Sequence, residues 1–154
     1  MPLRTSAGPT AAHVVTAAAE ALRFAGPHAV LTSHTALYLY GCHAADRGTT
    51  HVLVPYRRRV RTRGGLTVHH GSVQRRDVEI LYGLRVLVLE PALAEVLCRG
   101  DPYVAVSCLD QALARQPSRQ GFTERVIQAV QARADPRGRR EAEILLRARC
   151  PGTA

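Results

Sequence analysis

The sequence contains no lysine, and all 21 of its basic residues are arginine. Without a lysine amine, the chain has no Schiff-base nucleophile, no phosphate-binding P-loop lysine and no lysine for a typical nuclease site. Arginine stays charged at any working pH and grips phosphate or carboxylate groups with a fork of donors. A GC-rich coding sequence is one explanation for this bias, and the physical consequences are the same. The composition disfavours several enzyme classes and favours the binding of anions.

Long apolar runs and closely spaced cysteines are also missing. No run approaches the roughly 18 apolar residues that span a membrane, and the opening MPLRTSAGPT lacks a contiguous apolar signal core. The four cysteines, Cys42, Cys98, Cys108 and Cys150, form no C-x-x-C pair of the kind that zinc sites normally show. We therefore predict a cytoplasmic protein with reduced thiols, no metal, no cofactor and no membrane association.

Motifs of nucleophilic and metal-dependent catalysis are absent from the sequence. Neither G-x-S-x-G nor H-E-x-x-H occurs, and the dinucleotide and P-loop glycine patterns are missing too. Cys42 and His43 are adjacent, but adjacency alone does not give the contact geometry of a nucleophile and its base. We predict a protein that is not an enzyme and has no catalytic residues.

Acidic residues are rare in the first half of the chain. Residues 1–76 carry ten arginines against Glu20 and Asp46, a net charge of +8. Residues 77–154 carry eleven arginines against ten acidic residues, a net charge of +1. Such an asymmetry favours nucleic acid or an acidic protein surface as the partner of the first half.

The positive charge is densest in the segment His51–His70, HVLVPYRRRVRTRGGLTVHH. An apolar run stops at Pro55, five arginines follow within Arg57–Arg63, and a second alternating run begins after Gly64-Gly65. This pattern predicts two antiparallel strands, Thr50–Val54 and Leu66–His70, joined by an arginine-rich hairpin loop.

We predict that this hairpin contacts the DNA backbone with little base specificity, because arginine-rich loops neutralise phosphates and nothing in the loop suggests base reading. A solubilising surface loop is the alternative interpretation. The predicted nucleic-acid-binding residues are Arg57, Arg58, Arg59, Arg61, Arg63, Arg75 and Arg76.

The remaining pattern predicts an α+β fold. We expect two N-terminal helices, Ala11–Ala25 and a second one from Thr32 or Ser33 through Tyr40, then a small, mainly antiparallel sheet of about four strands. A second hairpin, Val78–Leu81 with Leu84–Val88, is expected across Tyr82-Gly83. A C-terminal helical region follows, with helices ending at Arg99 and spanning Pro102–Arg115, Phe122–Ala134 and Arg139–Arg149.

Three regions are predicted: a disordered N-terminus over residues 1–10, an α+β domain over 11–116, and a helical extension over 117–154. The two N-terminal helices flank a Gly-Pro turn, which raises the possibility of a helix-turn-helix. The second helix, HTALYLYG, is apolar on most sides and holds no arginine, whereas a recognition helix needs polar and basic residues. We therefore expect this helix to be buried.

Two pairs of residues are weaker candidates for chemistry. His51 and one of His69 and His70 could meet across the hairpin, but two histidines are too few for a metal site. Asp77 and Glu79 share one face of a strand, as paired magnesium-binding carboxylates do. Simple charge pairing with neighbouring Arg75 and Arg76 is the simpler interpretation.

Several stretches of the chain resemble AbiEi-like antitoxin proteins of type IV toxin–antitoxin systems. They are GPHAVLTSHTALYLYG, HVLVPYRRRVRTRGGLTVHHGSV, DVEILYGLRVLVLEPALAEVL and AVSCLDQALAR, which together cover most of Ala25–Arg115. The resemblance implies a transcriptional regulator that contacts DNA and opposes a nucleotidyltransferase-type toxin. Where the family tends to carry an Arg-Thr pair and, four residues after that arginine, an aspartate, this chain has Leu93, Ala94 and Leu97.

The family pattern normally opens with a winged helix-turn-helix, and we expect no such segment before Ala11. Related proteins often continue into a domain resembling the very-short-patch repair endonuclease, so the chain is expected to correspond to the middle domain. Two alternatives to the antitoxin-like regulator remain open: an accessory or remnant domain of a nuclease-associated protein, and a basic adaptor that binds an acidic protein.

Overall fold

A computed structural model of the protein describes the backbone of residues 2–150 and the side chains of residues 11–150. The first helix, α1, spans Pro2–Ala25 and contains the predicted helix Ala11–Ala25. The disorder predicted for residues 1–10 stays a prediction, because residue 1 and the side chains of residues 2–10 lie outside the described part of the chain. None of the described helices is long and apolar enough to cross a membrane.

The fold is α+β, as predicted, and the described residues form one mixed sheet of five strands. The strands are β1 (Val30–Leu31), β2 (Thr50–Val54), β3 (Leu66–His70), β4 (Val78–Leu81) and β5 (Leu84–Leu87), in the order β3-β2-β1-β5-β4. The predicted count of about four strands did not include β1, a two-residue strand within the short extended piece that the sequence indicates at Ala29–Leu31, yet β1 lies at the centre of the sheet.

The predicted antiparallel pairing of Thr50–Val54 with Leu66–His70 is wrong. Strands β2 and β3 are parallel, with Thr50 opposite Leu66 and Val54 opposite His70. The sheet is therefore mixed rather than mainly antiparallel, since β1 also runs parallel to β5 and antiparallel to β2. Antiparallel strands can be joined by a tight turn, but a parallel pair needs a chain segment that returns to the starting end. Residues 55–65 are this crossover.

The second predicted hairpin is confirmed. β4 and β5 are antiparallel, and Leu81 lies opposite Leu84 across Tyr82 and Gly83. Both turn residues have positive φ angles, +53° for Tyr82 and +76° for Gly83. Positive φ at both central positions matches the right-handed twist of the strands, and glycine adopts it without a steric penalty.

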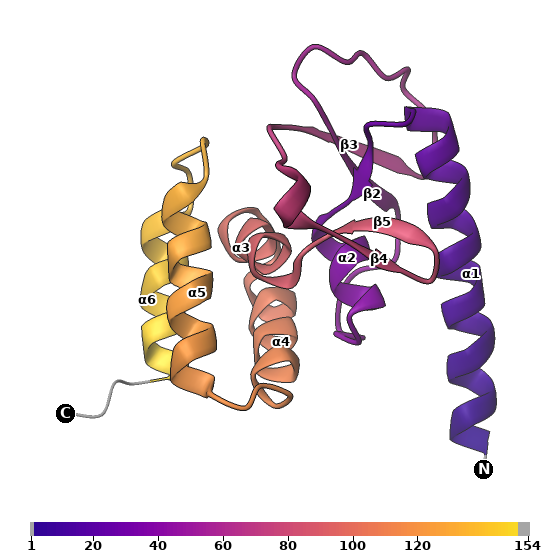
Figure 1. Cartoon of the computed structure of the whole chain (residues 1–154). Helices are drawn as coiled ribbons and strands as arrows, with labels where there is room; N and C mark the ends of the chain where they lie inside the picture. Colours follow the sequence, from indigo (N-terminus) through magenta and orange to yellow (C-terminus); the bar gives the residue numbers. More distant parts are fainter. Residues whose placement is uncertain (1, 151–154) are drawn as a thin grey trace.

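The helices lie on both sides of the sheet (Figure 1). Helix α1 stands at one end of the molecule, and α2 (Ser33–Leu39) lies between the sheet and the helical region. The remaining helices are α3 (Leu89–Arg99), α4 (Pro102–Leu113), α5 (Arg119–Ala132) and α6 (Arg139–Arg149). The bounds predicted for α6 and for the end of α3 are confirmed, while α4 and α5 differ from prediction by two or three residues at their ends.

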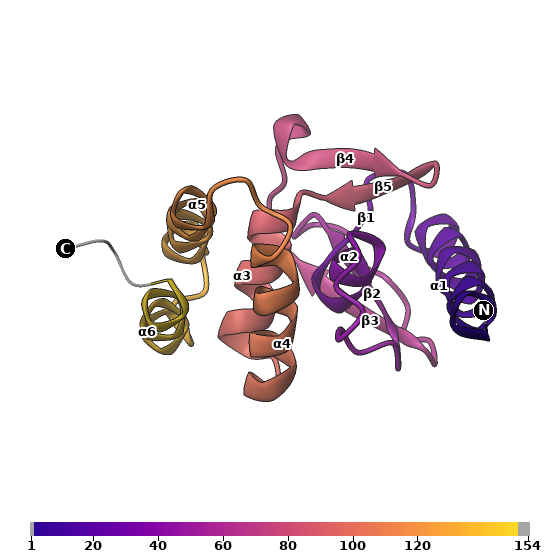
Figure 2. The same cartoon turned by 90° about the horizontal axis from the view of Figure 1, so that it is seen from below.

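One core connects the sheet to the C-terminal helices. Leu31 and Val86 in the sheet, Leu93 in α3 and Phe122 in α5 are fully buried members of the same hydrophobic cluster. Figure 2 shows α3 and α4 between the sheet and the α5–α6 pair. Burying each such side chain stabilises the fold by about 2 kcal/mol. The helices after residue 116 thus share their core with the sheet through α3.

Helix α2 is buried, as expected. Ser33 and residues 35–39 are buried, and only His34 within the helix retains intermediate exposure. The strand β1 separates it from α1, so the two helices do not form a helix-turn-helix unit. A helix covered on nearly every side cannot present side chains to a DNA groove.

Candidate nucleic-acid interface

The arginine segment, Arg57–Arg63, lies on the crossover between β2 and β3 and not in a hairpin loop. The crossover has no helix or strand of its own and rises beyond the sheet near the C-terminal end of α1 (Figure 1). All five arginines predicted to bind nucleic acid here are exposed: Arg57, Arg58, Arg59, Arg61 and Arg63. The segment therefore presents its charge to solvent even though its predicted topology was wrong.

Two of these arginines also hold the crossover in place. The Arg58 Nε donates a hydrogen bond of 3.1 Å to the carbonyl oxygen of Ala25 at the end of α1, and the His70 ring contacts the Arg58 carbonyl at 3.1 Å. The Arg63 guanidinium lies 4.9 Å from the ring centroid of Phe24, a cation–π distance. Arg58 consequently has a structural role that the sequence did not indicate, whereas Arg59 and Arg61 have no such anchor among the described contacts.

Arg75 and Arg76 lie in a short 3-10 turn, η1 (Arg75–Asp77), just before β4. Both are exposed, and neither pairs with Asp77 or Glu79, so the predicted charge pairing does not form. Asp77 instead accepts a hydrogen bond of 3.2 Å from the backbone N–H of Gln74. Glu79 accepts a hydrogen bond from the Tyr40 hydroxyl, and burial, reinforced by this bond, raises the pKa of Tyr40.

An open cavity of about 530 Å³ lies at the carboxyl ends of β2 and β3, and we call it the strand-end cavity. Because these strands are parallel, the residues that follow each of them emerge side by side at one edge of the sheet. Tyr56 and Arg57 follow β2, while Ser72 and Arg75 follow β3, and all four line the cavity. The parallel pairing thus brings together two arginines from different parts of the predicted set.

None of the seven predicted arginines forms an ion pair among the described residues. In the C-terminal half, by contrast, six arginines do. They are Arg99, Arg125, Arg133, Arg137, Arg147 and Arg149. The crossover and η1 therefore carry uncompensated positive charge, the condition under which arginines can neutralise phosphates.

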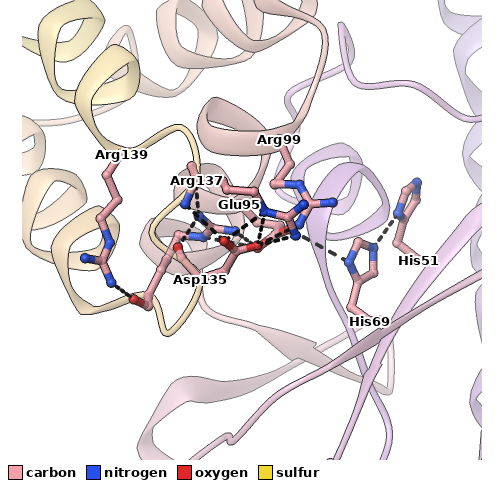
Figure 3. Close-up of polar contacts among 8 residues, drawn as sticks. His51, His69, Glu95, Arg99, Asp135, Arg137 and Arg139 are labelled. Atoms are coloured by element: carbon pink, nitrogen blue, oxygen red, sulfur yellow. Dashed lines mark hydrogen bonds and ion pairs between the residues drawn. The ribbon is translucent and has the colours of Figure 1, made fainter.

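A second polar feature joins the sheet to the helices (Figure 3). The ring nitrogens of His51 on β2 and His69 on β3 are 2.9 Å apart, and His69 Nδ1 lies 3.8 Å from a Glu95 carboxylate oxygen on α3. Arg133, at the end of α5, donates two hydrogen bonds to the same carboxylate, at 3.0 and 3.3 Å. We call these four residues the seam network, since it crosses from the sheet to α5.

Burial holds the histidines of the seam network in their neutral form. Desolvation, reinforced by the nearby His69 and His34, lowers the pKa of His51 to about 4. The pKa of His69 is also lowered by burial, although Glu95 acts in the opposite direction. His51 and His69 are in contact, as expected, but they come from two parallel strands and not from the predicted antiparallel hairpin. No group of three or more His, Cys, Asp or Glu residues in the described part of the chain is arranged to hold a metal ion.

The loop between α5 and α6 extends the seam network with further arginine contacts. Asp135 accepts hydrogen bonds from Arg99 and Arg137, each at 2.8 Å, and the Arg133 guanidinium donates to the Asp135 and Arg137 carbonyls. Sequence reasoning predicted the meeting of His51 with His69 but missed Glu95 and Arg133, because the members of the seam network come from β2, β3, α3 and the end of α5. No local pattern links these segments.

All four cysteines are free thiols. Burial raises the pKa of Cys42 to about 11 and that of Cys108 to about 12, which keeps both protonated near neutral pH. Since the thiolate is the reactive form, these two side chains are poor nucleophiles. His43, the neighbour of Cys42, packs against the Tyr38 ring with centroids 4.9 Å apart.

The positions where the resembling family tends to carry an Arg–Asp pair are in the core. Leu93 is fully buried and Leu97 is 9% exposed, one turn apart on α3. No family model matches the chain, and a search of curated proteins found no match.

Proposed function

We propose that the protein is a non-catalytic, antitoxin-like regulator that contacts the DNA backbone through the crossover and η1. The observation that carries the proposal is the set of seven exposed, uncompensated arginines. They belong to the half of the chain that holds eight of its nine net positive charges. The resemblance to AbiEi-like proteins supports the regulatory part of the proposal, with a nucleotidyltransferase-type toxin as a further partner in the cytoplasm.

The chemistry of this surface suits phosphate contact better than base reading. The arginines lie on a crossover and a 3-10 turn, neither of which offers the rigid helix or strand ribbon that enters the major groove. Affinity should therefore depend on counterion release and should vary little with sequence. Each phosphate neutralised contributes a slope of about −0.9 to the plot of log K against log salt.

Duplex DNA binding measured over a series of salt concentrations tests the proposal. The key variant is Arg59→Ala/Arg61→Ala, because both side chains are exposed and neither makes a described hydrogen bond. We expect a drop of about tenfold or more in affinity at low salt and a slope shallower by roughly 1.8, the value for two phosphate contacts.

The matched control is Arg119→Ala/Arg140→Ala, which removes the same charge from two exposed arginines of the C-terminal half. This control should bind nearly as well as the parent protein. Equal losses in the two double variants would show that net charge alone drives binding, and unchanged binding in the crossover variant would refute the assigned interface.

A further inference from the structure

The strand-end cavity combines an apolar floor with a cationic rim. Its floor includes Val30, Leu53 and Val54 from the sheet, while Arg57 and Arg75 approach it from two different segments. Gly71 is also part of the lining, and a Cβ added there would lie 3.2 Å from a Leu53 methyl carbon. A side chain at position 71 would therefore press against the floor, so glycine helps to keep the cavity open.

The rim also offers an aromatic ring. Tyr56 lines the cavity and is 62% exposed, so its ring is accessible to a ligand. An exposed ring and two arginines around one cavity are the combination that proteins use for unpaired nucleotides, in which the base stacks and the phosphate pairs with arginine. Ser72 adds a hydroxyl that can donate or accept a hydrogen bond.

We propose that the strand-end cavity binds one unpaired nucleotide, with the base on Tyr56 and the apolar floor and the phosphate between Arg57 and Arg75. The volume of about 530 Å³ lies within the range of pockets that enclose small ligands. A base within an intact duplex is stacked and paired, so only a single-stranded extension, a gap or a free single strand supplies this ligand. The inference deepens the proposed function and rests on it for the source of the nucleotide.

The effect of the cavity can be separated from the effect of net charge, because Arg75 has an arginine neighbour outside the cavity. Arg75 lines the cavity, whereas its neighbour Arg76 does not, and both are exposed. Arg75→Ala and Arg76→Ala therefore remove equal charge from adjacent positions, and only the first removes a cavity residue. Tyr56→Phe keeps an aromatic ring, while Tyr56→Ala removes it.

The experiment compares a blunt duplex with the same duplex carrying a single-stranded extension, by fluorescence anisotropy at fixed salt. The parent protein should prefer the extended duplex by about tenfold, the size of one base-stacking contact. Arg75→Ala and Tyr56→Ala should lose this preference, and Arg76→Ala and Tyr56→Phe should retain it. Free dTMP should compete for the extended duplex more strongly than inorganic phosphate does.

The outcomes separate this proposal from the proposed function. Equal binding of both duplexes by the parent protein would overturn the cavity site and leave the backbone interface standing. Saturable binding of dTMP that Arg75→Ala abolishes, without any binding of DNA, would support the cavity as a site for a free nucleotide and refute the DNA interface. A preference for the extension that survives in Arg75→Ala and Tyr56→Ala would place the nucleotide elsewhere and overturn the cavity site.

Discussion

Arginine has opposite surroundings in the two halves of this protein. In the C-terminal half, six of the eleven arginines pair with carboxylates: Arg133 pairs with Glu95, for example, and Arg99 and Arg137 share Asp135. On the crossover and η1 no carboxylate pairs with it. The same residue type therefore holds helices together in one region and remains available to an external anion in the other. Acidic partners, not the number of arginines, decide which role each arginine takes.

The largest expected effect on stability comes from removing Arg133. Its side chain is only 11% exposed, and its guanidinium donates to Glu95 and to two backbone carbonyls. Arg133→Ala leaves the Glu95 carboxylate short of a partner, and we expect it to lower the free energy of unfolding by about 2–3 kcal/mol. Urea denaturation measures the change. A loss below about 1 kcal/mol would show that the seam network contributes little, and DNA affinity should stay unchanged.

The next largest effect is on the dependence of stability on pH. The pKa of His51 is lowered to about 4 in the folded protein, so the folded state favours the neutral ring. The neutral ring therefore contributes to the free energy of unfolding in full above the unfolded pKa near 6.5, and this contribution is lost as the pH falls toward 4. Burial also lowers the pKa values of His34 and His69, so both add to this dependence on pH. Asp46 opposes the shifts of His34 and His51, and Glu95 opposes that of His69. We expect a loss of about 2 kcal/mol from His51 at pH 5.

His51→Asn should flatten this part of the profile of unfolding free energy against pH, although it lowers stability at neutral pH. His13→Asn, at an exposed position on α1, provides the control and should keep the full dependence. An unchanged slope in His51→Asn between pH 6.5 and 5 would contradict the role of the buried ring.

A smaller effect on stability should distinguish two neighbouring arginines of the arginine segment. Arg58→Ala removes the hydrogen bond to the Ala25 carbonyl and should lower the free energy of unfolding by about 1 kcal/mol. Arg59→Ala, one residue further along the exposed segment, should change it by less than about 0.5 kcal/mol. Thermal or urea unfolding of the two variants gives the comparison. Equal stabilities would mean that the contact with α1 does not anchor the crossover.

The smallest effect is expected where a paired arginine is exposed. Arg147 pairs with Glu143 one turn away on α6, and its side chain is 63% exposed. Solvent and salt screen such pairs, so Arg147→Ala should leave the urea midpoint unchanged within error. A shift as large as that of Arg133→Ala would show that pairing alone, rather than burial, gives the C-terminal arginines their structural role.

Local signals predicted much of the fold. The turn at Tyr82-Gly83 set the register of β4 and β5, and the last helix has the predicted bounds, Arg139–Arg149. The predicted direction of β3 relative to β2 was wrong, because strand direction depends on the path of the chain between the two strands. An arginine-rich stretch with two glycines fits a turn and a crossover equally well. The two-residue strand β1 is too short to give a periodic signal.

The candidate site was also predictable only in part, because local composition fixes some of its properties and contacts between distant segments fix the others. Exposure of the arginine segment follows from its composition, since unpaired charges stay in water. The placement of Arg57 and Arg75 around one cavity depends on the parallel register, and the contact of His69 with Glu95 depends on the packing of α3 on the sheet. Interactions between distant segments leave no trace in local spacing, so sequence reasoning found the charges but not their neighbours.

The short central strand also has a consequence for how the chain folds. Leu31 on β1 lies opposite both Val52 on β2 and Val86 on β5, so the two halves of the sheet meet only through this two-residue strand. The β4–β5 hairpin involves only neighbouring residues and can close within microseconds. Joining it to β1 brings together residues 55 positions apart, a loop closure that costs entropy before contacts compensate for it. We expect assembly around Leu31, rather than hairpin formation, to limit the folding rate.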